Sequence, residues 1–235
     1  MRADPVSHHP LRYYETSNRY YVWKPSGIAS VPGKRVSLFD LFWYTPQEKK
    51  HPQTLLDRTL PEGGLVVRLD VCTSGLVLFA KNRLAYHTYK EKQDAGLITK
   101  IYYATVYGRP SCSYGVIACF LAQHRDDPVR VIVQTAKNRQ QGKKRYWTET
   151  LYEVCDYDQS TNISLIRCEI QRGFRHQIRC HLQLLGFPIV GDNLYIPSNH
   201  PAYLHRQEPD HISLSCMGYT NLPDAIPVAF SLASD

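Results

Sequence analysis

Short runs of β-branched and aromatic residues, each bounded by turn-forming residues, recur along most of this chain. Such runs favour β-strands, and they outnumber the stretches with helical spacing. The predicted strands are residues 19–24, 63–70, 74–81, 100–108, 129–134, 148–157, 163–170 and 211–216. Helical spacing occurs in residues 83–97 and 175–186, and a glycine ends each pattern. The sequence therefore predicts an α+β fold built on a mixed, mostly antiparallel sheet.

The length and the charge of the chain narrow its class. With 235 residues, 43% of them hydrophobic, the chain can bury one good-sized core, which favours one domain over two. Its 28 Lys and Arg exceed its 21 Asp and Glu, for a formal net charge of +7. Excess positive charge attracts polyanions, so nucleic acid is a fitting partner, although such a charge also serves solubility alone.

The cysteines and the apolar runs bear on the cellular compartment of the protein. The 7 cysteines are scattered and include no C-x-x-C pair, which favours reduced structural thiols over a zinc or redox site. We expect no bound metal. No apolar run approaches the roughly 18 residues of a membrane span, and the first residues lack the apolar core of a signal peptide. We expect a cytoplasmic protein that does not bind membranes, with organellar and nuclear locations left open.

Two further stretches have a local interpretation. Residues 137–145, KNRQQGKKR, are basic without apolar periodicity and predict a solvated loop or hairpin tip. There Lys143, Lys144 and Arg145 would follow an RNA backbone, the alternative being an ordinary charged surface loop. Residues 38–44, LFDLFWY, favour a helix that packs in the core over a platform on which bases stack.

An acidic residue lies between two apolar runs. The predicted strand 63–70 ends in Asp70, and the following Thr-Ser-Gly leads by a turn into the next strand. This puts a carboxylate at the rim of the sheet. A lone acid there is commonly a turn-former that accepts nearby backbone N–H groups.

Two other segments concentrate chemical groups. In residues 100–108 the alternation of a strand puts Lys100 and Tyr102 on one face, where Tyr102 bears the only hydroxyl. Residues 172–181 hold Arg175, His176 and Arg179 at the start of the second predicted helix. Arg175 and Arg179 are one helical turn apart, away from the apolar stripe of that helix.

These motifs together are similar to a known family. RLDxxTSG, KxYxAxVxG, GFRHQIRxHLxxLGxPIxGDxLY and KPSGxxSVPG resemble the RluA-type pseudouridine synthases over about residues 20–215. Any one of the motifs is a weak signal, whereas all of them at these separations make coincidence improbable.

The resemblance implies an RNA-modifying isomerase that converts uridine to pseudouridine without a cofactor. Its RNA substrate would be rRNA or tRNA, its fold a curved, mostly antiparallel sheet with flanking helices and a central active-site cleft. The catalytic domain would span residues 20–235 after a tail of residues 1–19. Many relatives carry an additional S4 RNA-binding domain, which we do not expect here because the catalytic pattern begins at about residue 20. We expect a monomer.

The resemblance also assigns roles to matching positions. Asp70 falls on the catalytic aspartate, Tyr102 on the active-site tyrosine, and Arg179 on the arginine that forms an ion pair with the aspartate. In the family the tyrosine stacks on the uracil and has been proposed as the base at carbon 5. That role requires a pKa below the ordinary tyrosine value of about 10.

Three basic residues are expected at the RNA. Arg68 falls on an arginine that helps to flip the target base, and its alternative is a salt bridge to Asp70. Arg175 and His176 lie where the N–H groups of a helix start favour a phosphate, and their alternative is a structural cap. The chain departs from the family pattern at Val67, Phe174, Arg175 and Ser215, so the RNA target of a relative does not transfer directly.

The sequence leaves two rival functions open. One is a catalytically degenerate member of the family that only binds RNA. The other is a metal-dependent hydrolase that would use His124, Asp126 and Asp127 with His176 or His181. The HRDD segment looks more like a loop of satisfied polar residues, and residues 176 and 181 share a helix face poorly.

Overall fold

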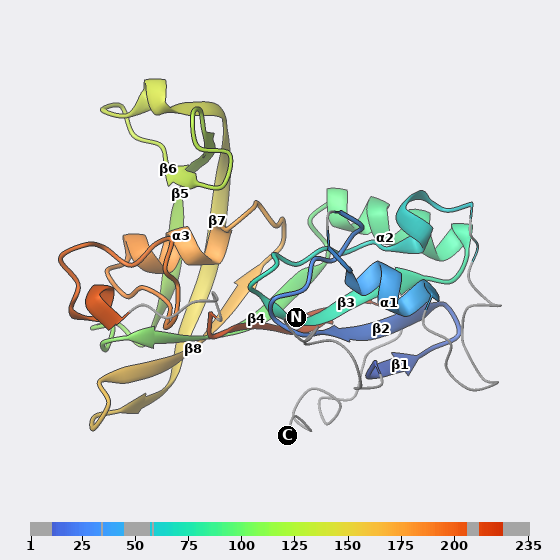
Figure 1. Cartoon of the computed structure of the whole chain (residues 1–235), viewed down its shortest axis with the longest axis horizontal. Helices are drawn as coiled ribbons and strands as arrows, with labels where there is room; N and C mark the ends of the chain where they lie inside the picture. Colours follow the sequence, from blue (N-terminus) through green and yellow to red (C-terminus); the bar gives the residue numbers. More distant parts are fainter. Residues whose placement is uncertain (1–10, 34, 45–56, 58, 206–211, 223–235) are drawn as a thin grey trace, which may run out of the picture.

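A mixed sheet runs through the whole molecule. The computed structural model describes residues 11–33, 35–44, 57, 59–205 and 212–222. Within them the sheet has 9 strands in the order β1-β2-β3-β9-β4-β8-β7-β5-β6 (Figure 1). The strands are β1 Tyr13–Glu15, β2 Arg19–Lys24, β3 Ser74–Ala80, β4 Thr99–Tyr107, β5 Tyr114–His124, β6 Val131–Val133, β7 Gly142–Asp158, β8 Ile163–Ile170 and β9 Leu214–Thr220.

All neighbouring strands are antiparallel except β3 and β9, which are parallel. The predicted α+β class with a mixed, mostly antiparallel sheet is confirmed. Strand β9 lies in the middle of the sheet, between β3 and β4. It therefore joins the part of the sheet formed by β1–β3 to the part formed by β4–β8.

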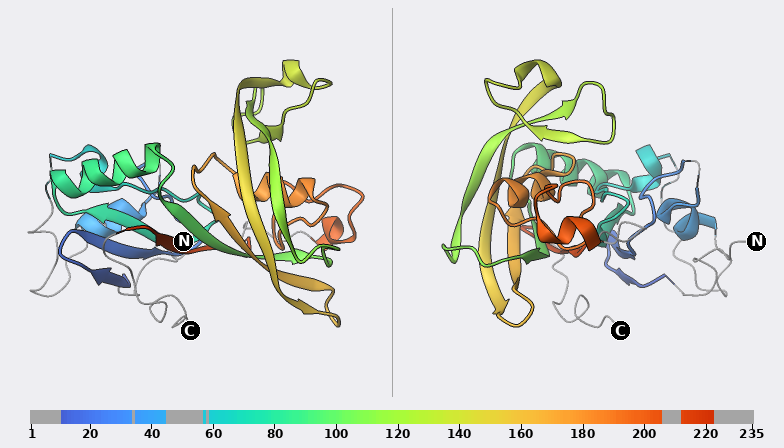
Figure 2. Two further views of the ribbon diagram at one scale, coloured as in Figure 1. Left: turned by 180° about the vertical axis from the view of Figure 1, so that it is seen from behind. Right: turned by 60° about the vertical axis from the view of Figure 1, so that its left-hand side comes forward.

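Three helices flank the sheet: α1 Leu38–Tyr44, α2 Arg83–Asp94 and α3 Gln177–Leu184 (Figure 1). Helices α1 and α3 pack on the sheet face that carries Val77 and Phe79 of β3, and α2 packs on the opposite face, against Leu76 and Leu78. Short 3-10 turns span Pro61–Gly64, Arg139–Gln141 and Pro201–His205. The end of β5, strand β6 and the start of β7 project from the sheet and are called the arm (Figure 2). The base of the arm packs on α3, where Leu121 and Val131 contact Cys180. Among the described helices, none combines the length and apolar character that a membrane crossing requires.

Local patterns predicted several of these elements correctly. Strands β2 and β8 have the predicted bounds, and Gly96 and Gly186 follow α2 and α3 with φ angles of 71° and 94°. The helix predicted over 38–44 is α1, and it packs in the core. Phe42, 1% exposed, stacks on Phe79 with ring centroids 4.5 Å apart.

Other predictions were wrong. Residues 63–70 are not a strand, because they leave the sheet after one bridge between Leu65 and Phe79 and one hydrogen bond from the Val66 N–H to the Leu78 carbonyl. Strand β5 was missed. The tail predicted over 1–19 is too long, since residues 13–15 pair with β2 as the edge strand; residues 1–10 lie outside the described part.

The basic segment 137–145 is only partly a loop. Strand β7 already begins at Gly142, and Arg145 pairs with Ala122 of β5. Residues 143–147 are all exposed, so this part of the strand turns no face to the core. Basic side chains are tolerated there for that reason, and apolar alternation could not reveal the strand.

Gly75 permits the parallel contact between β3 and β9. Its φ angle is 121°, and a Cβ atom at this position would collide with the backbone N and O of Cys216. We expect Gly75→Ala to lower the free energy of unfolding by about 2–3 kcal/mol through strain and strand separation. Urea unfolding measures the loss. Gly218→Ala on β9 is the control, because a Cβ there meets nothing within 4 Å; equal losses in both variants would contradict the argument.

Candidate active site

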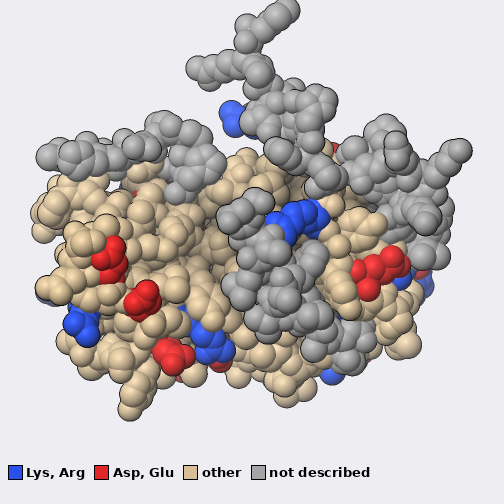
Figure 3. All heavy atoms as spheres, turned by 90° about the horizontal axis from the view of Figure 1, so that it is seen from below, with Lys and Arg blue, Asp and Glu red and all other residues tan. Residues whose placement is uncertain are grey.

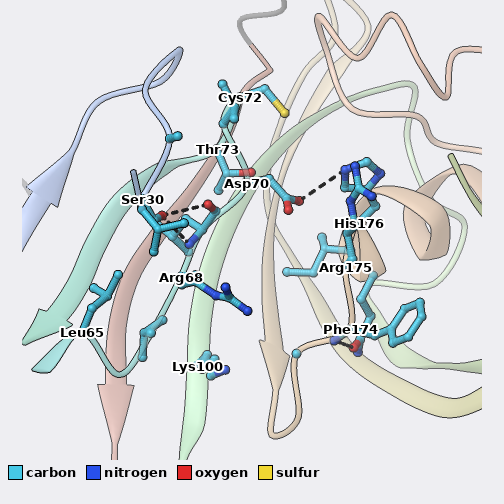
Figure 4. Close-up of a pocket in the computed structure, with 18 of the residues that line it drawn as sticks. Ser30, Leu65, Arg68, Asp70, Cys72, Thr73, Lys100, Phe174, Arg175 and His176 are labelled. Carbon is cyan, nitrogen blue, oxygen red and sulfur yellow. Dashed lines mark hydrogen bonds and ion pairs between the residues drawn. The ribbon is translucent and has the colours of Figure 1, made fainter. Parts of the chain in front are cut away.

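A cavity of about 930 Å³ lies between residues 65–73 and the segment that leads into α3 (Figure 4). The side chains of β4 at Lys100 and Tyr102 also line it. It brings together the following predicted residues: Arg68, Asp70, Tyr102, Arg175, His176 and Arg179. Lys143, Lys144 and Arg145 do not line it; they lie on the arm.

The loop at residues 24–30 holds the backbone around Asp70. Ser30 Oγ accepts from the Leu69 N–H (3.0 Å) and donates to the Leu69 carbonyl (2.9 Å). Ser26 Oγ donates to the Cys72 carbonyl at 2.7 Å, and the Gly27 N–H donates to the Val71 carbonyl at 2.8 Å. The KPSG motif is therefore a clamp on the turn that carries Asp70, a role that sequence reasoning missed.

Lys24 fastens the same clamp from within. It is fully buried, and its Nζ donates to the carbonyls of Pro25 (2.9 Å), Ile28 (2.7 Å) and Val71 (3.2 Å). Burial lowers the pKa of Lys24 to about 8. The three carbonyls satisfy the donors that burial removes from water, so this cation ties the two loops together.

Asp70 itself is reached through the cavity. Its side chain is 29% exposed, and its carboxylate lies 3.9 Å from Nε2 of His176 (Figure 4). Burial raises the pKa of Asp70, while the positive charges of Arg179 and Arg175 and a hydrogen bond from the His176 backbone N–H oppose the rise. A carboxylate held in this way is poorly solvated and therefore more reactive than one in bulk water.

Arg179 does not form the ion pair that the resemblance implied. Its Nε and Nη2 bind the carboxylate of Asp192, both at 2.7 Å, and its Nη1 donates to Sγ of Cys72 at 3.3 Å. Asp192 is fully buried and so requires a counter-charge, which occupies the guanidinium fork. Arg179 therefore acts on Asp70 only through its charge. Its partner Asp192 lies in the Gly-Asp pair of the third motif, to which the sequence alone assigned no role.

His176 closes the opposite wall. It is 7% exposed, precedes α3 with a φ angle of 54°, and its Nδ1 lies 2.9 Å from the Tyr195 hydroxyl. Burial and the charges of Arg179 and Arg175 lower the pKa of His176 to about 3, so the ring is neutral. Its backbone N–H already donates to Asp70, so this donor is not free for the phosphate that was predicted at the helix start.

Tyr102 is the floor of the cavity beside β9. Its side chain is 7% exposed, and burial raises its pKa well above 10. The lowered pKa that a base at carbon 5 requires is therefore not found in the free protein. Tyr102 is a neutral phenol with a ring face suited to a planar base.

Arg68 and Arg175 lie at the mouth of the cavity. Arg68 is exposed and forms its salt bridge with Glu62 at 3.3 Å, so the alternative pairing with Asp70 is wrong. Exposed salt bridges contribute at most about 1 kcal/mol, which leaves Arg68 available to a ligand. Arg175 Nη1 donates to the Pro128 carbonyl at 2.7 Å and so links α3 to the arm.

The basic residues of the arm are accompanied by aromatic rings. The Arg145 guanidinium lies 4.4 Å from the Phe120 ring centroid, and the Lys144 ammonium lies 5.4 Å from that of Tyr146. Tyr146 and the neighbouring Trp147 are 44% and 55% exposed. Exposed cations and aromatic faces together suit a phosphate backbone and unstacked bases.

The residues of the rival metal site do not meet. His124 Nδ1 accepts hydrogen bonds from the N–H groups of Asp126 (3.2 Å) and Asp127 (3.0 Å), which closes its own loop. His181 is buried between the hydroxyls of Thr148 (3.0 Å) and Thr150 (2.8 Å). No group of three or more metal-ligating side chains occurs within the described part of the chain.

Known proteins agree with this geometry. Residues 18–184 match the RNA pseudouridylate synthase family. The dual-specificity RNA pseudouridine synthase RluA of Vibrio parahaemolyticus is 33% identical over 83% of this chain and 72% of its own length. The protein of the same description from Escherichia coli K12 is 31% identical over 77% of this chain and 75% of its own.

Solved structures show the same fold. Human RNA pseudouridylate synthase domain containing 1 has a TM-score of 0.72 and 18% identity, covering 92% of this chain and 80% of its own. Human RNA pseudouridylate synthase domain containing 4 has a TM-score of 0.60 and 19% identity, covering 88% and 82%. From its family match and its relatives, the chain belongs to the RNA pseudouridylate synthase family and is an RNA-modifying isomerase of the RluA type.

Proposed function

We propose that Asp70 carries out the isomerisation of a uridine in rRNA or tRNA that has been flipped into the cavity. The observation that carries the proposal is the position of its carboxylate, reachable through the cavity and facing the neutral His176 ring at 3.9 Å. The cavity residues Asp70, Tyr102 and Arg179 all come from one chain, which supports action as a monomer.

The reaction defines what each group does. The bond between the ribose and nitrogen 1 breaks, the uracil turns, and the ribose bonds to carbon 5. Carbon 5 loses its proton and nitrogen 1 gains one, so the product is an isomer of uridine. Asp70 supplies the oxygen that attacks the ribose or takes up a sugar proton. Tyr102 holds the detached uracil by its ring face, and the walls of the cavity retain it. No atom is oxidised or reduced overall.

The charge around the cavity supports an RNA partner. The described lining residues include six Lys or Arg and two Asp or Glu: Arg35, Arg68, Lys90, Lys100, Arg175, Arg179, Glu62 and Asp70. On the described part of the surface in Figure 3, charged residues of both signs are scattered rather than gathered. We infer that RNA approaches from the cavity side and that Arg68, exposed at the mouth, takes the place of the flipped base.

The purified protein should form pseudouridine at one or a few defined uridines in rRNA or tRNA transcripts, and excess EDTA should not reduce the yield. Chemical mapping of pseudouridine in the transcripts, and in cells with and without the gene, measures this. Tight RNA binding with no conversion in any transcript would instead establish the degenerate binding module. Loss of conversion in EDTA would contradict the metal-independent mechanism.

A further inference from the structure

Lys100 is a buried cation without a role in the proposed reaction. It is 6% exposed, belongs to β4 and lines the cavity (Figure 4). Within the described part of the chain, no hydrogen bond or ion pair engages its ammonium group. A mostly buried ammonium group that has no protein partner and opens onto a cavity favours a ligand of opposite charge there.

A comparison with Lys24 shows that burial alone does not explain this state. Both residues are buried, but Lys24 Nζ donates to three backbone carbonyls, whereas Lys100 Nζ opens onto the cavity. Burial and the like charge of Lys90 both lower the pKa of Lys100. Of these two buried lysines, Lys24 therefore has hydrogen-bond partners within the described protein. Lys100 has none there and is left for a partner from outside the protein.

The space beside Lys100 is kept open. A Cβ atom at Gly173 would lie 3.3 Å from the Lys100 Nζ, so the missing side chain leaves room at the ammonium group. Lys90 Nζ donates to the Val66 carbonyl at 3.4 Å, and Arg68 forms an ion pair with Glu62. One acid therefore faces three cations at this end of the cavity, and a further negative charge is favoured there.

We propose that Lys100 binds a phosphate of the target nucleotide. This inference rests on the proposed function and names a contact within it. The phosphodiester is the one anionic group that RNA carries at neutral pH, so it is the fitting partner of this cation. Lys100 and Tyr102 are next neighbours on one face of β4, about 7 Å apart along the strand. That spacing is comparable with the separation of a base from its own phosphate.

The experiment compares the parent with Lys100→Met in RNA binding as a function of salt. We expect the variant to bind at least about 10-fold more weakly, and its slope of log K against log salt to be smaller by about 0.7 to 0.9. Its melting temperature should not fall, because an apolar chain of similar length replaces an unpaired buried charge. Lys92→Met is the matched control: Lys92 is a half-buried lysine of α2 that does not line the cavity, and its Nζ donates to the Asn221 carbonyl at 3.4 Å.

A neutral RNA linkage identifies the partner. A methylphosphonate on the 5′ or 3′ side of the target uridine should weaken binding of the parent as much as Lys100→Met does, and should weaken the variant no further. Additive losses at both linkages, or an unchanged slope, would overturn the inference. Conversion of the unmodified RNA by the parent is measured separately. If the parent converts uridine but the effects of the neutral linkage and of Lys100→Met are independent, this inference fails and the proposed function stands.

Discussion

Asp70→Asn should lower the rate of uridine conversion by at least about 10³-fold while the protein stays folded and still binds RNA. Asn has the shape of Asp but cannot attack the ribose or take up a proton. Single-turnover conversion of a transcript that the parent modifies gives the rate, and a binding isotherm gives the affinity. Asp126→Asn is the control, since Asp126 is exposed in the 125–130 loop. Conversion by Asp70→Asn at the parental rate would refute the assignment of Asp70.

The same substitution, Asp70→Asn, should lower the conversion rate but increase the stability of the fold relative to the parent as pH rises. Burial raises the pKa of Asp70 in the folded state above its unfolded value. Its contribution to stability is therefore complete below the unfolded pKa and is lost as pH rises through the folded pKa. Asn carries no charge, so the melting temperature of the variant relative to the parent should increase between about pH 4 and pH 8. A difference that shrinks over this range would show that Asp70 is better solvated than the structure indicates.

The second large effect concerns the buried ion pair. Asp192→Asn should lower the free energy of unfolding by about 3–5 kcal/mol and the melting temperature by roughly 10 °C. Asp192 is fully buried, and both of its oxygens accept from the Arg179 guanidinium at 2.7 Å. In the variant this guanidinium would be left buried beside a neutral amide. Thermal and urea unfolding measure the loss.

A double variant separates charge from packing. Arg179→Met with Asp192→Leu removes both charges, so its stability should lie closer to that of the parent than the stability of Asp192→Asn alone. A double variant that is less stable than Asp192→Asn would mean that the hydrogen bonds of the pair, and not the unpaired charge, govern stability here.

Local chemistry was readable from the sequence. Asp70 lies in a turn because Thr-Ser-Gly follows it, and the Thr73 N–H does donate to the Asp70 carbonyl at 3.1 Å. Strands such as β4 alternate buried and half-buried positions, so the shared face of Lys100 and Tyr102 was predictable. Patterns of this kind depend on neighbours within a few residues.

Long-range partners were not readable. Lys24 meets the Val71 carbonyl across 47 residues, and the clamp at Ser30 spans 39. The partner of Arg179 depends on which acid is the more deeply buried, and Asp192 has no exposure whereas the Asp70 side chain has 29%. Burial of this kind is a property of the assembled sheet and not of any short pattern.

The central position of β9 affects the order in which the protein can mature on the ribosome. Asp70 precedes β3 and Tyr102 belongs to β4, and these two strands are joined through β9, whose residues are 214–220. A nascent chain that has not yet released this segment can form the pairs β2–β3 and β4–β8 but cannot unite them. Because these contacts span more than 100 residues, the chain must be synthesised through β9 before the catalytic groups meet.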